Sequence, residues 1–287
     1  MNSMASAMPM YCFASPTTMT MSYEDIIAAT KATRDLGHGA SIPGFHLEGP
    51  FINVKYKGAQ NAAFIKEPTM ELIRKCNSVK IVTVAPEIKG SLDFIRECPA
   101  VVALGHTDCD YDVARAAFEA GARSLTHTFN AMPPIHHRSP GPILAGMDDG
   151  RVYAQLIADG KHVHPASVRA LIKLYGTDKV VLISDSVEAA GLEDGQYTLG
   201  GLDIIVKEGT ARTLEGNLAG STSTLFECVR KVISFGFSKE DAVKMASEVP
   251  AGMMGLNKGK IEVGYDADFI IVDEDFNLVK SIVRGEF

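Results

Sequence analysis

Short apolar runs rich in valine, isoleucine and leucine alternate along the chain with segments whose apolar residues recur at helical spacing. This alternation is typical of repeated strand–helix units around a parallel sheet. The pattern predicts helices that include 23–35, 112–120 and 165–175. It predicts strands at 11–15, 42–47, 80–85, 101–105, 124–128, 153–157 and 180–184.

Two of the expected helices carry start signals. Ser22 is suited to cap the first helix, because Asp25 follows three residues later, as in a capping box. Pro165 suits the first turn of the third helix, where its missing N–H is not needed. Both signals support the strand–helix pattern.

Strands of this kind predict an α/β fold, a (β/α)8 TIM-type barrel that lacks its first strand. A closed barrel needs eight strands, and the pattern supplies one fewer. The chain begins almost directly in a strand, so we expect the remaining strand to be absent from this polypeptide, as in a truncated product. An open barrel leaves two sheet edges exposed, which makes its stability a concern.

The character of the chain changes after Gly191. Residues 196–206 and 210–217 resemble short antiparallel strands with Gly-rich turns, and helical stretches at 223–235 and 239–247 follow. We expect 259–273 to form two strands joined by a tight turn. The resulting domain prediction is a barrel over 10–255, with small-domain strands inserted near 196–217, and the rest of a small β domain over 256–287.

Composition and charge limit the classes of partner and the cellular compartment that we expect for the protein. A net charge of −7 without a long Lys/Arg run argues against nucleic acid. No apolar stretch approaches the length of a membrane span. Met1–Met10 has no basic segment followed by a long apolar one, as a signal peptide would, and the five cysteines form no C-x-x-C pair. We therefore expect a cytoplasmic protein with reduced thiols and a small-molecule partner.

One carboxylate and two imidazoles follow apolar runs at the expected strand ends. They are Glu48, His106 and His127. A single histidine in this setting is more often structural, but three suitable groups at equivalent positions favour a divalent metal site with open positions. His46 lies two residues before Glu48 and shares its face of the strand, so we expect it to support the ligands rather than to bind the metal.

Asp185 ends the last apolar strand. An acid at the mouth of a barrel can take a proton from an activated water and pass it to a leaving group. The alternative is a helix cap or an Asx-turn, which is common for aspartate at such a place. Its position opposite the expected metal favours the catalytic role.

Three loop features could bind a ligand. Arg138 follows two prolines and could hold a phosphate or carboxylate, although a lone exposed arginine is usually only a solvated charge. In Asp159-Gly160-Lys161-His162-Val163-His164 we expect His162 to contact substrate and His164 to cap the next helix or support the site. The segment 216–222 resembles a weak anion cradle before a helix.

Taken together, these segments closely resemble the N-acetylglucosamine-6-phosphate deacetylases of the amidohydrolase superfamily. The similarity runs from about Pro16 to the C-terminus, and several motifs occur in the family's order. The matching runs are His46-Leu47-Glu48-Gly49-Pro50-Phe51, Lys57-Gly58-Ala59-Gln60, Gly105-His106-Thr107, Thr126-His127-Thr128-Phe129-Asn130-Ala131-Met132, Asp159-Gly160-Lys161-His162, Ser184-Asp185-Ser186 and Leu218-Ala219-Gly220-Ser221-Thr222.

The resemblance implies an activity and a role for each of these residues. The expected reaction is hydrolysis of the acetamide of N-acetylglucosamine 6-phosphate, with Asp185 as general base and then general acid. The expected metal is zinc, iron or another divalent ion, one per chain, and the enzyme would be a homodimer in which Arg138 often acts across the interface. The expected metal ligands are Glu48, His106 and His127. The expected substrate-binding residues are Asn130, the Ala131 backbone and Arg138 at the sugar phosphate, with His162 and Gln60 at the sugar and acyl group.

The chain departs from the family pattern at its start. The family usually begins with small-domain strands and a first barrel strand that often carries an H-x-H metal pair, and neither occurs here. Family members with one metal manage without that pair, so the chemistry is still possible. Two alternatives stay open: a catalytically impaired, truncated remnant, and a deacetylase of another N-acetylhexosamine phosphate such as the galactosamine analogue. A dihydroorotase-like enzyme would need a bridging lysine and more histidines.

Overall fold

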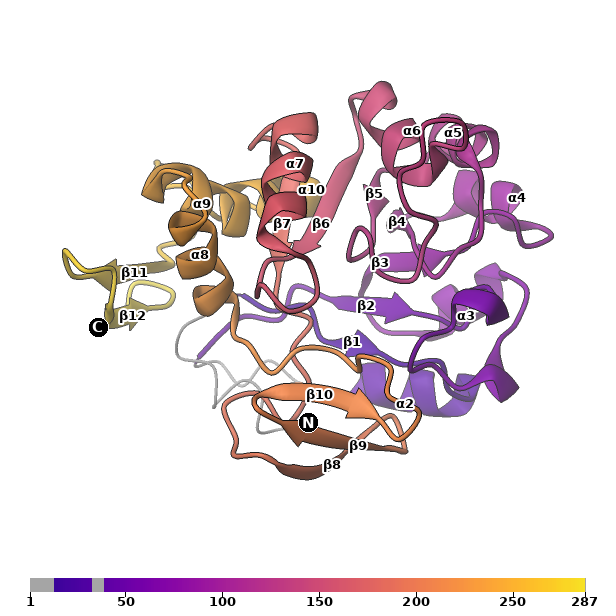
Figure 1. The fold of residues 1–287 in the computed structure, drawn as a ribbon, viewed down its shortest axis with the longest axis horizontal. Helices are drawn as coiled ribbons and strands as arrows, with labels where there is room; N and C mark the ends of the chain where they lie inside the picture. The colour runs from indigo at the N-terminus through magenta and orange to yellow at the C-terminus, as the bar shows by residue number, and fades with distance from the viewer. Residues whose placement is uncertain (1–12, 33–38, 287) are drawn as a thin grey trace.

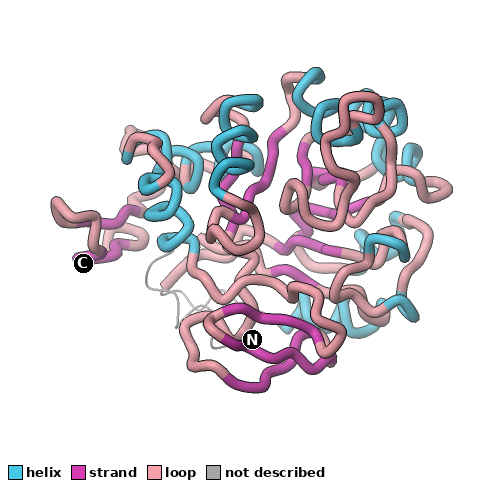
Figure 2. Tube along the Cα trace, viewed as in Figure 1, coloured by secondary structure: helices cyan, strands magenta, loops and turns pink. Residues whose placement is uncertain are grey.

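A parallel, curled sheet forms the centre of the molecule, which we describe from a computed structural model over residues 13–32 and 39–286. The strand order is β1-β2-β3-β4-β5-β6-β7, with helices packed around the sheet (Figures 1 and 2). Among the described residues β1 and β7 do not pair with each other, so the sheet is an open barrel. The predicted (β/α)8-type fold short of one strand is confirmed. The strands are β1 (Thr17–Thr18), β2 (Phe45–Glu48), β3 (Val79–Val84), β4 (Val101–Leu104), β5 (Ser124–Leu125), β6 (Tyr153–Ile157) and β7 (Val180–Ile183).

Helices follow most of these strands, as the sequence pattern predicted. Asp25 N–H bonds to the Ser22 hydroxyl at 3.1 Å, and Pro165 is the first residue of its helix, so both start signals are confirmed. Four helices of six to nine residues were not anticipated, because so few turns show a periodicity only weakly. These unanticipated helices are α3 (Met70–Lys75), α4 (Ser91–Glu97), α6 (Gly141–Asp149) and α10 (Glu248–Met254). The anticipated ones are α2 (Tyr23–Ala32), α5 (Tyr111–Ala120), α7 (Pro165–Tyr175), α8 (Leu225–Ser234) and α9 (Lys239–Ala246).

The strand expected at 11–15 is wrong in its position. Residues 11 and 12 lie outside the described residues, and Phe13 makes only an isolated bridge with Ser41. Pairing with β2 begins three residues later, where the Pro16 carbonyl accepts the His46 N–H at 3.0 Å, so the strand is β1. The last three residues of the helix expected at 23–35 also lie outside the described residues.

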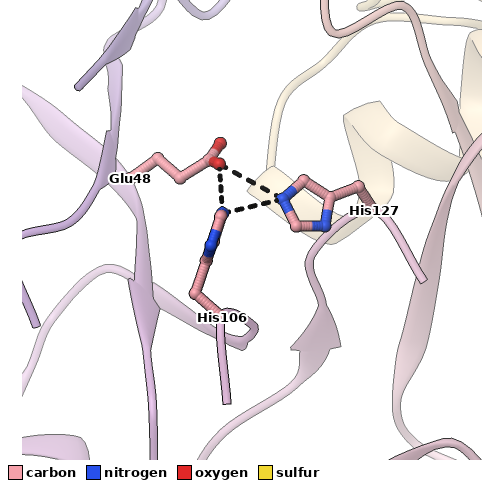
Figure 3. A group of neighbouring side chains, drawn as sticks. All are labelled: Glu48, His106 and His127. Carbon is pink, nitrogen blue, oxygen red and sulfur yellow. Dashed lines mark hydrogen bonds and ion pairs between the residues drawn. The ribbon is translucent and has the colours of Figure 1, made fainter. Parts of the chain in front are cut away.

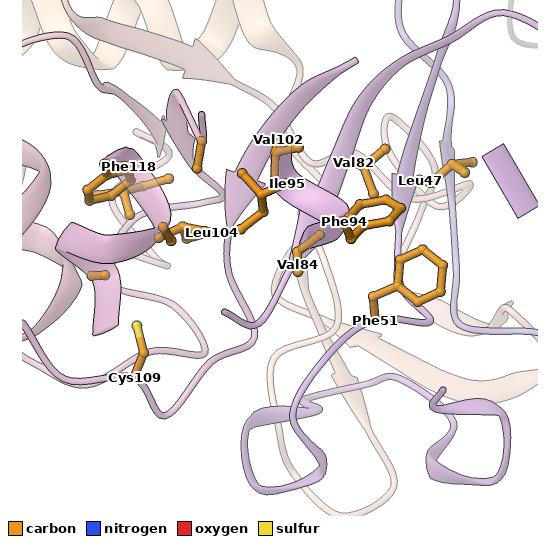
Figure 4. Close-up of a cluster of buried hydrophobic side chains, with 14 of the residues drawn as sticks. Leu47, Phe51, Val82, Val84, Phe94, Ile95, Val102, Leu104, Cys109 and Phe118 are labelled. Carbon is orange, nitrogen blue, oxygen red and sulfur yellow. The ribbon is translucent and has the colours of Figure 1, made fainter. Parts of the chain in front are cut away.

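Alternation along each strand separates the core from the site. Leu47, Val82 and Leu104 point outward and pack against helical residues such as Phe94 and Phe118 (Figure 4). Inside the barrel His46 Nε2 lies 2.8 Å from the Thr83 hydroxyl. Since neighbouring residues of a strand face opposite sides, the apolar outer face fixes which polar groups point inward.

The small antiparallel strands form two separate sheets. The segment after Gly191 gives β8 (Gly195–Leu199), β9 (Leu202–Lys207) and β10 (Thr210–Thr213), as expected, and in Figure 1 this sheet lies next to β1. The expected pair of strands within 259–273 is wrong. Ile261 and Val263 are 93% and 102% exposed and outside any strand, and β11 (Phe269–Val272) pairs instead with β12 (Leu278–Ile282).

The physical reason for this error lies in the turn. Asp273 accepts the Asn277 N–H at 2.7 Å, and this Asx-type bond closes a tight turn after β11 rather than before it. β11 and β12 pack against α8, where Phe276 stacks on Phe226 at 5.4 Å between ring centroids. The domain division at 10–255 and 256–287 stays a prediction. No described helix combines the length and the apolar character needed to cross a membrane.

Candidate metal centre and active site

Three side chains from the ends of three strands of the sheet meet inside the barrel. Glu48 is the last residue of β2, and His106 and His127 each lie two residues beyond β4 and β5. The Nε2 atoms of His106 and His127 lie 2.9 Å and 3.2 Å from Glu48 Oε1 and 3.1 Å from each other (Figure 3). All three residues are buried, and their ligand atoms lie within 4.8 Å of one another.

The orientation of the His106 ring is fixed from behind. Its Nδ1 lies 2.8 Å from the Tyr56 carbonyl oxygen. A carbonyl can only accept, so Nδ1 carries the proton, and in the neutral ring Nε2 presents a lone pair to Glu48 and His127. A histidine that binds a metal is commonly held in this way.

The charges of the cluster are strongly coupled. Burial alone would raise the pKa of Glu48, but the imidazoles of His127 and His106 hold it well below its ordinary value. Burial alone would lower the pKa of His127, but the charge of Glu48 outweighs it and raises the pKa to about 9. Without another cation, His127 therefore supplies the positive charge that Glu48 needs.

These residues fit a divalent metal ion. One carboxylate oxygen and two imidazole nitrogens converge on one point, and the lone pair of the His106 Nε2 atom is directed there. His127 Nδ1 is buried without a hydrogen-bond partner among the described residues, so the contacts of its Nε2 orient that ring. An ion would replace the proton on His127 and accept a lone pair from both rings. Mixed nitrogen and oxygen ligands that leave further positions open suit a catalytic ion of the zinc or iron type.

Asp185 faces the same cavity from two residues beyond β7. Burial and then the negative charge of Glu48 raise the pKa of Asp185 to about 6. Its carbonyl accepts the Ser221 N–H at 2.8 Å, and Val187 N–H returns a bond of 3.0 Å to Ser221. The segment predicted as an anion cradle therefore uses one of its amides to hold the Asp185 loop.

A cavity of about 800 Å³ contains the cluster and most of the other predicted site residues. Arg138 does not line it: this arginine lies on an exposed loop, with Nη1 2.7 Å from His137 Nε2. The predicted residues that do line the cavity are Glu48, Gln60, His106, His127, Asn130, Ala131, His162 and Asp185.

The remaining predicted residues are held by specific contacts. Gln60 is buried and its Oε1 accepts the Thr20 N–H at 2.6 Å. His164 accepts the Ala166 N–H at the start of α7, so it is a helix cap. His46 Nε2 contacts the Thr83 hydroxyl, and burial lowers the pKa of His46 to about 4, so its ring is neutral at pH 7.

Sequence reasoning missed Asp159. Its Oδ2 lies 2.8 Å from His162 Nδ1, while its Oδ1 accepts the N–H groups of Lys161 and His162. The carboxylate therefore fixes the ring of His162 and keeps its other nitrogen toward the cavity. The signal available in the sequence was the three-residue spacing from Asp159 to His162 after a buried strand.

A seven-stranded barrel sheet with this cluster at its strand ends defines the class of protein. The amidohydrolase family model matches residues 13–287, and the chain belongs to the amidohydrolase family.

Within that family the chain groups with sugar-phosphate deacetylases. It is 38% identical to the N-acetylglucosamine-6-phosphate deacetylase of Vibrio furnissii, over 94% of this chain and 71% of that one. It is 35% identical to the N-acetylgalactosamine-6-phosphate deacetylase of Escherichia coli O157:H7, over 94% and 76%. The structure superposes on a D267A mutant of the Mycobacterium smegmatis N-acetyl-D-glucosamine-6-phosphate deacetylase in complex with that sugar phosphate. This superposition has a TM-score of 0.90 and 34% identity and covers 96% of this chain and 76% of that one.

Proposed function

We propose that the chain hydrolyses the acetamide of N-acetylglucosamine 6-phosphate to glucosamine 6-phosphate and acetate. The observation that carries the proposal is the convergence of Glu48, His106 and His127 in one cavity with Asp185. The names of its relatives and the sugar phosphate bound to its structural neighbour support the choice of substrate.

The residues of the site suit an acid–base mechanism. A divalent ion held by Glu48, His106 and His127, zinc or iron by the donor set and one per chain, would act as a Lewis acid toward the acetamide carbonyl and lower the pKa of an attacking water. Asp185 accepts the proton of that water on its carboxylate. The water oxygen bonds to the carbonyl carbon, and the carbon–nitrogen bond breaks as Asp185 passes the proton to the departing nitrogen. A carboxyl whose pKa is raised toward neutrality can perform both steps.

The place of Asn130, Ala131, His162 and Gln60 in the cavity lining supports the substrate-binding roles that we propose for them. Asn130 and the Ala131 backbone line the cavity and would hold the phosphate with Arg138, while His162 and Gln60 would contact the sugar and the acetyl group. The bond from Asp159 to His162 supports this role, because it leaves the second ring nitrogen for a ligand.

The assembly and the compartment belong to the same proposal. We propose a homodimer, because Arg138 lies on an exposed loop away from the cavity of its own chain and would serve the cavity of a second copy. We propose the cytoplasm, because the four described cysteines are free thiols. Burial raises the pKa of Cys109 to about 12, which favours the thiol form.

The galactosamine epimer is the second candidate substrate. The similarity to the Escherichia coli N-acetylgalactosamine-6-phosphate deacetylase is nearly as high as that to the glucosamine enzymes. Both sugar phosphates are therefore assayed in parallel, and the ratio of the two kcat/KM values identifies the preferred one.

Acetate release by the purified chain, with and without added Zn²⁺, tests the proposal. We expect zinc-dependent release that falls by roughly 10²–10⁴-fold in Asp185→Asn, since this is the usual contribution of a positioned acid–base group, with zinc affinity nearly unchanged. Asp178→Asn is the matched control, because Asp178 is exposed at the opposite end of β7. Full turnover in Asp185→Asn would remove its assigned role, and no release from folded, zinc-loaded protein would favour the impaired remnant.

A further inference from the structure

A single carboxylate forms hydrogen bonds with two of the loops near the proposed metal ligands. Glu87 lies in the loop after β3 and accepts three hydrogen bonds from two other loops. Its Oε1 accepts the Asn53 side-chain N–H at 2.8 Å and the Asp108 N–H at 2.7 Å, and its Oε2 accepts the Thr107 hydroxyl at 2.6 Å. The donors lie 20 to 34 residues away from Glu87, so the contacts join loops that the sheet alone does not connect.

Asn53 links Glu87 to His106 through hydrogen bonds on one side of the histidine. Its N–H donates to the His106 carbonyl at 2.8 Å, and its side chain caps the 3-10 helix Val54–Tyr56 by accepting the Lys55 N–H. That helix ends at Tyr56, whose carbonyl accepts the His106 Nδ1–H at 2.8 Å. Both the backbone and the ring of His106 are therefore held by a segment that is itself bound to Glu87.

Thr107 and Asp108 link Glu87 to His106 on the other side. They follow His106 directly in the chain, and each donates to Glu87. His106 has a φ of +47°, in the left-handed region that residues with a side chain avoid. Flanking contacts are needed to hold such a conformation, and Glu87 provides them on both sides.

We propose that Glu87 is a positioning residue for the metal site: it sets the backbone and ring of His106 so that Nε2 points at Glu48 and His127. The inference rests on the proposed metal-dependent function, but concerns a residue outside the ligand set. Glu87 does not line the cavity and its side-chain hydrogen bonds go to Asn53, Thr107 and Asp108 rather than to a proposed ligand side chain, so its effect passes through these three residues.

Zinc affinity of the full chain, measured by competition with a chromophoric chelator, tests the proposal without relying on turnover. We expect Glu87→Ala to weaken zinc binding by about 10- to 100-fold, as loss of a ligand-orienting contact does elsewhere. Glu87→Gln should bind close to the parent, because its oxygen can keep both N–H donors and its amide can donate to Thr107 Oγ1. Glu97→Ala, an exposed glutamate on the following helix, should bind as the parent.

The outcomes separate this inference from the proposed function. A parent chain that binds no zinc, or a Glu48→Ala variant that binds as well as the parent, would overturn the metal site and this inference with it. Zinc binding by the parent that Glu87→Ala leaves unchanged, or that Glu87→Gln loses as fully as Glu87→Ala, would overturn the role of Glu87 alone. Thr107→Val removes one of the three bonds to Glu87, together with the bond that the Thr107 hydroxyl accepts from the Cys109 N–H, and covers the case in which Glu87→Ala does not fold. It should weaken binding in the same direction by less, and unchanged binding in it would count against the role.

Discussion

Several residues at the site hold backbone conformations that side chains disfavour. His106, His127, Ala131 and Asp185 have φ values of +47°, +29°, +49° and +49°. The left-handed conformation costs roughly 1–2 kcal/mol for a residue with a Cβ. The sharp turns after β4, β5 and β7 aim these side chains into the barrel, so the strain is part of how the cavity is built.

Arg138→Ala tests recognition of the phosphate. We expect the KM for the phosphorylated sugar to rise by roughly 10- to 100-fold, because hydrogen bonds to charged groups are worth about 1.5–3 kcal/mol. The rate on unphosphorylated N-acetylglucosamine should not change. Arg115→Ala, an exposed arginine on α5, is the control. Equal losses on both sugars would contradict a phosphate-binding role.

Mixing two impaired chains tests whether Arg138 acts across subunits. In a mixed dimer of Arg138→Ala and Asp185→Asn, one cavity would combine an intact Asp185 with the partner's intact Arg138. Acetate release at low substrate concentration should then exceed that of either variant alone. A mixture that matches the mean of its components would place Arg138 in its own chain's site or outside the reaction.

The sequence could predict the site residues that lie at the ends of buried strands. It could not predict the residues that orient these site residues. Glu48, His106, His127 and Asp185 each follow an apolar run, and parallel strands bring such ends together. Glu87 follows such a run as well, yet its role depends on donors from other loops. No local spacing encodes contacts of this kind.

At the scale of elements, the apolar strands could be predicted well and the short polar strand β1 poorly. The strands at 101–105, 153–157 and 180–184 each differ from the structure by at most one residue, because they are largely buried and mostly apolar. β5 ends at Leu125 rather than at 128, since the chain turns at His127 to aim its ring inward. β1 consists of two threonines, which give too weak a pattern to place correctly.

Gly220→Ala tests how the loop before α8 supports the Asp185 loop. Gly220 has a φ of +65°, and a Cβ there would lie 2.5 Å from Val187 Cγ1 and 3.1 Å from the Asp185 carbonyl oxygen. The methyl group must displace the Asp185 loop, so we expect kcat to fall by roughly tenfold or more, as small misplacements of catalytic groups do.

Gly191→Ala is the matched control for this prediction. Gly191 is exposed in the segment between β7 and β8 and has a φ of +78°, but a Cβ there meets nothing within 4 Å. Both variants should lose about 1–2 kcal/mol of stability from the left-handed conformation, and only Gly220→Ala should lose turnover. Similar kcat values in the two variants would show that the contact with Val187 and Asp185 does not position the catalytic carboxyl.

At the scale of the whole molecule, the metal site links strands that are far apart in sequence, within a sheet that does not close into a complete barrel. Glu48 and His127 are 79 residues apart in sequence, and His106 follows β4, one of the two strands between β2 and β5. In the metal-free chain the ion pair of Glu48 with His127 maintains this junction. We therefore expect the chain to fold without metal and to become more stable when metal binds.

Thermal unfolding with and without Zn²⁺ measures this effect. At a zinc concentration about 100 times Kd the stabilisation is about 2.7 kcal/mol, and for a chain of this size that corresponds to a rise in Tm of roughly 5–10 °C. His127→Ala should lose most of the rise. His164→Ala, which removes an exposed cap of α7, should lower Tm in both states and keep the rise. A parent chain whose cooperative unfolding is insensitive to zinc, or a His127→Ala variant that keeps the full shift, would show that the cluster of Glu48, His106 and His127 does not bind the ion.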